Sequence, residues 1–270
     1  MPRAQLTLRD ANVLHKISDP EHSLSAPVLI DESLARDPHV TDPADYESVI
    51  SAERQIIREF QSLEEIIAAL GSADETARRQ LSNDYDACTA KLSALSAAYP
   101  LYASAHNNKA QALRRKFGHS VLLRSVNPHP GLLNARLLED EDIITEAANH
   151  ILTSLEAAIS LLSPPSPLAP ISLQAGKTLA QSYTQRGALY HVTARQMASD
   201  PDASLRISRF WTRDDLEEMA SRDFMMGGRY GNEIARSLAV ATNPAAKLCG
   251  AVVKQAMQEE FGGFPLSREK

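Results

Sequence analysis

The chain has 270 residues, a net charge of −6 and two cysteines far apart in the sequence. This length supports a substantial core without disulfides or metal, and the two thiols cannot make a disulfide framework. The negative charge disfavours binding of nucleic acid by the surface as a whole. No apolar run approaches the ~18 residues of a membrane span, and residues 1–23 lack the apolar centre of a secretory signal. We therefore expect a cytoplasmic protein.

Residues 1–41 are mixed in composition and contain prolines at positions 20, 27 and 38. We expect them to form a partly irregular N-terminal arm that lies along the rest of the molecule or stays mobile. Residues 42–265 follow as one all-α domain, and residues 266–270 form a short tail.

The first long pattern is typical of two helices that fold back on each other. Asp42 can cap the first helix, over 44–70, Gly71 ends it, and the second helix covers 74–98. Apolar residues recur at alternating spacings of mostly four and three: Ile56, Phe60, Leu63, Ile67 and Leu70, then Leu81, Tyr85, Cys88, Leu92, Leu95 and Tyr99. Since the turn between the helices is short, the sequence predicts a long antiparallel helical hairpin.

The middle of the chain is also predicted to be helical. Segment 108–126 is expected to form a helix despite Gly118. Segment 139–162 carries an apolar stripe made of Ile144, Ala148, Ile151, Leu155, Ile159 and Leu162. The proline-rich segment 163–172 cannot continue this helix and is a stiff connection or a hinge. A further helix is expected over 173–198.

Toward the C-terminus the sequence predicts shorter helices. One begins at Thr212, where Asp215 completes a capping box. The glycine-rich run 225–232 is predicted to interrupt the helical pattern, and two more helices follow, the last ending near Phe261. No segment alternates with period two, so strands are not expected. The prediction is an all-α bundle of about seven helices built on the hairpin.

Residues 138–156, LEDEDIITEAANHILTSLE, are rich in acids and contain a histidine. Asp142, Glu146 and His150 follow at intervals of four, so their side chains align on one face of the helix. A zinc site needs three or four ligands, and this face points away from the apolar stripe. We interpret the stretch as a solvated helix start whose carboxylates favour the positive end of the helix dipole. No metal and no cofactor are predicted.

The segment 109–124 is basic and contains no acid. Its cations are Lys109, Arg114, Arg115, Lys116 and Arg124. Because they go all round the helix, we expect them to pair with the acidic segments 44–86 and 139–156 inside the fold. The alternative is an exposed patch that binds an anionic partner, since arginine suits phosphate and carboxylate groups.

A third candidate site combines the glycine-rich run 225–232 with the helix 173–198. The run frees the backbone to turn beside an arginine, just before a helix start whose N–H groups can hold an anion. The predicted buried stripe of 173–198 includes an arginine and tyrosines, and a buried arginine needs a partner or a ligand. The residues of this candidate ligand site are Arg186, Tyr190, His191, Gly228 and Arg229. The ordinary alternative is a plain turn between helices and an arginine paired with an acid.

The sequence contains no nucleophile elbow, HExxH motif or Cys–His signature, so no catalytic residue is predicted. The favoured function is an intracellular protein-interaction module, that is, an adaptor, regulator or assembly subunit that presents helix faces to a partner protein. One alternative is an enzyme or sensor of a small anionic ligand, bound between helix 173–198 and loop 225–232. Another is docking on an anionic surface through 109–124. Extension of the hairpin stripe into a homodimer stays open.

Overall fold

The computed structural model of the chain describes residues 28–69, 75–124, 140–200, 202–207 and 210–243. Seven helices account for most of this part, which confirms the predicted all-α bundle. They are α3 (Pro43–Ala69), α4 (Glu75–Ala98), α5 (Ala103–Phe117), α6 (Glu141–Leu162), α7 (Leu173–Ser199), α8 (Arg213–Arg229) and α9 (Glu233–Thr242). None of them combines the length and the apolarity that crossing a membrane requires.

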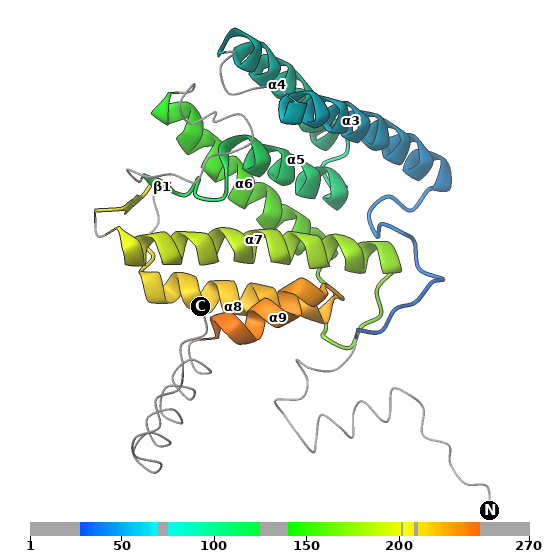
Figure 1. Cartoon of the computed structure of the whole chain (residues 1–270). Helices are drawn as coiled ribbons and strands as arrows, with labels where there is room; N and C mark the ends of the chain where they lie inside the picture. Colours follow the sequence, from blue (N-terminus) through cyan, green and yellow to red (C-terminus); the bar gives the residue numbers. More distant parts are fainter. Residues whose placement is uncertain (1–27, 70–74, 125–139, 201, 208–209, 244–270) are drawn as a thin grey trace, which may run out of the picture.

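The helices succeed one another from one end of the molecule to the other (Figure 1). α3 and α4 lie at one end, α8 and α9 at the opposite end, and α5, α6 and α7 between them. α5 faces two cores at once. Ala105 and Ala112 pack with the apolar residues of α3 and α4, whereas Leu113 and Phe117 pack with those of α6, α7 and α8. The α3–α4 pair is therefore attached to the rest of the bundle largely through α5.

α3 begins where the sequence predicts it. Asp42 accepts hydrogen bonds at Oδ1 from the backbone N–H groups of Ala44 and Asp45, at 2.9 and 3.0 Å, and so caps the helix. The buried hydrophobic residues of the two helices include most of the predicted stripe: Ile56, Phe60 and Ile67 in α3, and Leu81, Tyr85, Cys88, Leu92 and Leu95 in α4.

α3 and α4 pack against each other in opposite directions. Glu59 contacts Lys91, and Glu64, further along α3, contacts the earlier residue Tyr85 of α4. The rings of Phe60 and Tyr85 meet edge to face with their centroids 4.8 Å apart. The connection at 70–74, which the predicted hairpin needs, lies outside the described residues.

The predicted helix 108–126 is wrong at both ends. α5 starts five residues earlier, at Ala103, and ends at Phe117. Gly118 adopts a φ of 86°, a conformation that residues with a side chain rarely take, and this ends the helix. Beyond it, β1 (Leu123–Arg124) pairs antiparallel with β2 (Ser204–Leu205), a two-residue ladder that the sequence pattern does not reveal.

α6 and α7 agree with the predicted pattern. Every residue of the apolar stripe predicted over 139–162 is buried. α7 begins after Ser172, whose Oγ accepts a hydrogen bond from the backbone N–H of Ala175 at 3.2 Å. α8 begins after Thr212, which forms the predicted capping box with Asp215.

The predicted interruption at 225–232 is wrong, because α8 continues to Arg229 and only Tyr230, Gly231 and Asn232 separate it from α9. A Cβ on Gly228 would lie 2.8 Å from Cα of Arg236, so this glycine permits α9 to approach α8 closely. Gly231, with a φ of 103°, makes the turn. The glycines therefore serve helix packing as well as chain reversal.

The described part of the N-terminal arm lies along the domain. Ile30 forms a parallel β-bridge with Ile171, and the backbone oxygen of Arg36 accepts a hydrogen bond from Ser172 Oγ at 2.9 Å. His39 Nε2 lies 2.9 Å from the backbone oxygen of Leu161. Residues 1–27, the predicted last helix to Phe261 and the tail 266–270 lie outside the described residues. The domain limits and the hinge at 163–172 stay predictions.

Candidate functional site

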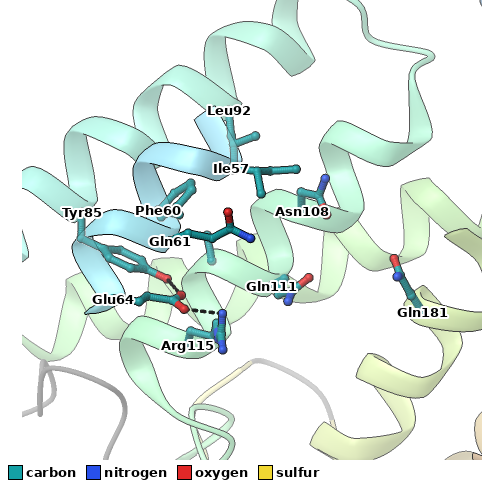
Figure 2. Close-up of a pocket in the computed structure, with 11 residues that line it drawn as sticks. Ile57, Phe60, Gln61, Glu64, Tyr85, Leu92, Asn108, Gln111, Arg115 and Gln181 are labelled. Carbon is teal, nitrogen blue, oxygen red and sulfur yellow. Dashed lines mark hydrogen bonds and ion pairs between the residues drawn. The ribbon is translucent and has the colours of Figure 1, made fainter. Parts of the chain in front are cut away.

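A cavity of about 200 Å³ opens between α3, α4 and α5, close to α7 (Figure 2). Its apolar wall consists of Ile57, Phe60, Tyr85, Leu92 and Ala112. Three of these residues belong to the predicted stripes, so the same periodicity that packs α3 on α4 also builds this wall. The small side chain of Ala112 leaves space where α5 crosses the helix pair. We call this space the α3–α5 cavity.

Four carboxamide side chains complete the wall: Gln61, Asn108, Gln111 and Gln181. Gln61 and Gln111 make no hydrogen bond with the part of the chain that the structure describes, so their polar atoms are available to a ligand. Asn108 is held in place. Its Nδ2 donates to Glu53 Oε1 at 2.9 Å, and its Oδ1 accepts from Asn107 Nδ2 at 3.3 Å.

An ion pair forms one end of the cavity (Figure 2). Arg115 Nη1 donates to Glu64 Oε2 at 2.5 Å, and the hydroxyl of Tyr85 donates to Glu64 Oε1 at 3.4 Å. The Glu64 side chain is 17% exposed and that of Arg115 is 50% exposed. Burial, followed by the charge of Glu64, raises the pKa of Tyr85, so its hydroxyl stays protonated and remains a donor.

A buried carboxyl group lies behind the cavity wall. Glu53 is 4% exposed and accepts hydrogen bonds from the hydroxyl of Tyr102, at 2.8 Å, and from Asn108. It forms no ion pair with a described residue. Burial raises the pKa of Glu53, and the hydrogen bonds from Tyr102 and Asn108 only partly offset this effect. Buried acids with a raised pKa beside a cavity are a common feature of functional sites.

The polar network continues from α5 into α7. Asn107 is 1% exposed, and its Oδ1 accepts from Ser182 Oγ and Gln185 Nε2, both at 2.9 Å. Its Nδ2 also donates to Oε1 of the wall residue Gln181 at 3.3 Å. Buried partners therefore fix two of the four wall carboxamides before any ligand arrives, which is the preorganisation that binding sites need.

A second cavity, of about 270 Å³, lies beneath the described arm at the start of α7. Arg36 and Arg54 line it beside Tyr46 and Ser172. The Arg36 side chain is 64% exposed and lies 3.5 Å from the equally exposed Glu47. Water screens such charges strongly, so this cavity offers a ligand less electrostatic stabilisation than the α3–α5 cavity.

The structure gives the residues of the predicted ligand site partners within the chain. Arg186 donates from Nε and Nη2 to both carboxylate oxygens of Asp223, at 2.7 and 2.8 Å. Tyr190 is 3% exposed, and its ring meets that of Trp211 edge to face. Arg229 forms a different contact: its Nη2 donates to the backbone oxygen of Pro167 at 2.6 Å. Loop 225–232 is absent, because most of it is helix.

The two other residues of that site have packing roles. Gly228 lies against α9, as described above, and the His191 ring contacts that of Phe224 with centroids 6.2 Å apart. Anion binding by the five residues stays a prediction. An anion at Arg186 would have to displace a bidentate carboxylate.

The basic segment 109–124 largely pairs with the acidic helices, as expected. Lys116 is 1% exposed, and its Nζ contacts both oxygens of Asp86 at 2.7 and 2.8 Å. Arg124 Nε lies 3.8 Å from a carboxylate oxygen of Glu141. Arg115, the third paired cation, bonds Glu64 at the cavity. These contacts hold α5 and β1 to α4, α6 and α3.

Lys109 and Arg114 have no carboxylate partner among the described residues. Arg114 Nη1 lies 3.4 Å from His119 Nδ1, and burial lowers the pKa of Arg114 to about 10, so it is still charged at neutral pH. Binding of an anionic partner by this patch stays a prediction.

The acidic stretch forms the start and an exposed face of α6. Glu141 and Asp142 lie in the first turn, where the helix dipole favours them. His150 Nε2 lies 3.3 Å from Glu146 Oε1, with both side chains exposed. Within the described ranges, no group of three or more His, Cys, Asp or Glu side chains has a geometry that could hold a metal ion.

Comparison with known proteins shows the family to which the chain belongs. No family profile and no solved structure matches the chain. A curated protein from Aspergillus fumigatus does match: it is 38% identical over 272 aligned positions, which cover 97% of this chain and 95% of the relative. That relative is the L-tyrosine degradation gene cluster protein hmgX. The chain belongs to the same family.

This relationship corrects the function predicted from the sequence. The relative is named for L-tyrosine degradation and not for an adaptor role, so the prediction of an adaptor, regulator or assembly subunit is wrong. The error arose because amphipathic helices bury their faces equally well in an enzyme, a binding protein and an adaptor.

Sequence reasoning missed most of the cavity. Glu53 carried a usable signal, since it continues the spacing Tyr46, Val49, Glu53, Ile56 of the buried stripe and is therefore an acid at a core position. Glu64 carried no comparable signal. The sequence identifies Arg115 only as one cation of the basic segment 109–124, because its pairing with α3 depends on how α5 crosses that helix.

Proposed function

We propose that this chain takes part in the degradation of L-tyrosine, and that the α3–α5 cavity binds a small ring compound of that process. One observation carries the proposal: the match to the L-tyrosine degradation gene cluster protein hmgX extends over 97% of this chain. A match of this extent includes α3, α4, α5 and α7, the helices that form the cavity.

The cavity supports the proposal by its size and its walls. A volume of about 200 Å³ equals that of roughly seven water molecules at about 30 Å³ each. Cavities for drug-sized molecules start at about 300 Å³, so this one suits a single ring with short polar substituents. Apolar side chains with a few fixed polar groups are the usual composition of such a site.

Gene deletion tests the proposed role. The organism that encodes this chain is grown with L-tyrosine as the sole carbon source after the gene is removed. We expect growth to be lost and to return when the wild-type chain is expressed. Unimpaired growth of the deletion strain on L-tyrosine would refute the role.

Two variants link the role to the cavity. Gln111→Trp places a large ring at the cavity wall, where the glutamine makes no hydrogen bond with the described chain, and should fail to restore growth. Lys91→Gln removes an exposed α3–α4 ion pair outside the cavity lining and should restore it fully. Growth restored by Gln111→Trp as well would place the function elsewhere in the chain.

We also propose that the protein works in the cytoplasm, which is consistent with the described helices, since none of them is long and apolar enough to cross a membrane. Microscopy of a fluorescent fusion tests this location. A homodimer stays a prediction that light scattering of the purified protein tests.

A further inference from the structure

We infer that the α3–α5 cavity binds a free aromatic α-amino acid, whose carboxylate contacts Arg115 and whose ammonium group contacts Glu64. This inference rests on the proposed function, because it takes the cavity to be the functional site. It adds the chemical class of the ligand and the two side chains that recognise it.

Arg115 has hydrogen-bond donors that no described residue uses. Only Nη1 is engaged, by Glu64, and neither Nε nor Nη2 makes a hydrogen bond with a described residue. Nε and Nη2 lie on one edge of the guanidinium and can donate two parallel hydrogen bonds to a carboxylate. At 50% exposure the side chain is accessible to a ligand that enters the cavity.

Glu64 supplies the matching negative group. Each of its oxygens accepts one hydrogen bond from a described residue, Oε2 from Arg115 and Oε1 from Tyr85, and a carboxylate oxygen has two lone pairs. Each oxygen can thus accept one more bond, which an ammonium group provides. Glu64 is 17% exposed, so its interaction with a cation is less screened than that of a surface acid.

Charge balance selects a zwitterion. Among the described residues that line the cavity, Glu64 and Arg115 are the only charged ones, and their charges cancel. A ligand with a carboxylate alone would give the cavity a net negative charge, with two carboxylates on one guanidinium. A ligand with an amine alone would give it a net positive charge, with two cations beside Glu64. An α-amino acid has both groups on one carbon and keeps the site neutral.

The rest of the cavity suits an aromatic side chain. Phe60 and Leu92 contribute apolar surface, and Leu92 and Asn108 lie at the end away from the ion pair (Figure 2). Asn108 is oriented by Glu53 from behind the wall. Its carboxamide, with that of Gln181, can bond a ring hydroxyl, and a site built for a hydroxyl rejects the analogue that lacks one.

Calorimetric titration of the full-length protein tests the inference with three matched probes. L-Tyrosine carries both charged groups, 3-(4-hydroxyphenyl)propionate lacks the ammonium group, and tyramine lacks the carboxylate. We expect L-tyrosine to bind and each analogue to bind at least tenfold more weakly, since each loses a charge-assisted hydrogen bond. No binding of L-tyrosine, or equal binding of either analogue, overturns the inference.

Three variants test the residues. Arg115→Gln and Glu64→Gln should each weaken L-tyrosine binding roughly tenfold to a hundredfold. Arg115→Gln should spare tyramine, and Glu64→Gln should spare the propionate, whereas general misfolding would change every ligand alike. The control Lys91→Gln breaks a cross-helix pair outside the lining, between Lys91 and Glu59, and should bind L-tyrosine as the wild type does. Wild-type affinity in both cavity variants overturns the assignment.

The growth experiment tests the metabolic role and the titration tests the ligand class, so the failure of one can be distinguished from the failure of the other. If the deletion strain cannot use L-tyrosine but the protein does not bind it, the metabolic role stands and the ligand class is wrong. If the protein binds L-tyrosine with the expected residue dependence but the deletion strain grows normally, the ligand class stands and the metabolic role is wrong.

Discussion

Two arginine–carboxylate pairs between helices of the described part of the chain differ in which hydrogen-bond donors they leave available. Between α7 and α8, Arg186 binds both oxygens of Asp223, and the two side chains are 19% and 4% exposed. Between α3 and α5, Arg115 binds Glu64 through one nitrogen, at the end of a cavity, with the arginine half exposed.

This difference separates a structural pair from a candidate binding pair. A buried bidentate pair uses the Nε/Nη2 edge of its arginine and both carboxylate oxygens, whereas the single bond from Nη1 of Arg115 leaves that edge without a partner among the described residues. The sequence pattern places Arg186 on a predicted buried stripe, and its buried position next to Asp223 explains why the two side chains pair.

The largest expected effect is at the α7–α8 contact. Arg186→Ala leaves the Asp223 carboxylate buried without a cation and should lower the free energy of unfolding by about 3–5 kcal/mol. Urea unfolding followed by circular dichroism measures this change. The double variant Arg186→Met with Asp223→Leu should recover most of it, and a double variant as unstable as the single one would contradict this account.

The next effect is at the glycine that brings α9 onto α8. Gly228→Ala places a Cβ 2.8 Å from backbone Cα of Arg236 and should cost about 1–3 kcal/mol of unfolding free energy, because the helices must separate. The matched control is Gly187→Ala, whose added Cβ meets side-chain atoms of Asp223 and Phe224 at 3.1 Å and should cost less. A larger loss at Gly187 would reverse this order.

Glu53 connects stability to pH behind the cavity. Its folded-state pKa is raised above the ordinary 4.5 by burial, so the unfolded chain loses this proton first as pH rises. The folded state therefore loses stability progressively above pH 4.5, and the loss stays constant once Glu53 has ionised in the folded state as well.

Glu53→Gln removes this penalty. Relative to the variant, the wild type should lose unfolding free energy between about pH 5 and about pH 8, which urea unfolding at both values measures. Comparison within each pH cancels the contributions of other groups. A constant difference between the two proteins would show that Glu53 does not titrate differently in the folded state.

The smallest expected effect on stability is at the cavity. Arg115→Gln breaks a pair whose arginine is half exposed, so the free energy of unfolding should fall by less than about 1 kcal/mol. Thermal unfolding measures this change in the absence of ligand. A loss as large as that of Arg186→Ala would mean that both pairs serve the fold alone.

The sequence by itself determined the helices and the faces they bury. Periodicity located α3, α4, α6 and α7, and local capping chemistry located starts such as Asp42 and Thr212, because these signals act within a few residues of one helix. The same locality explains the errors at Gly118 and Gly228. A glycine ends a helix in one place and allows close packing in the other, and only the neighbouring element distinguishes these cases.

Only the tertiary structure decided which polar side chains form hydrogen bonds and ion pairs with one another. Glu64 and Arg115 are 51 positions apart, and Glu53 reaches Asn108 across 55. Such pairs depend on the angle and offset at which α5 crosses α3, which arise from the packing of many apolar side chains at once. The cavity itself is the space that this packing leaves unfilled, so no single segment of the sequence contains it.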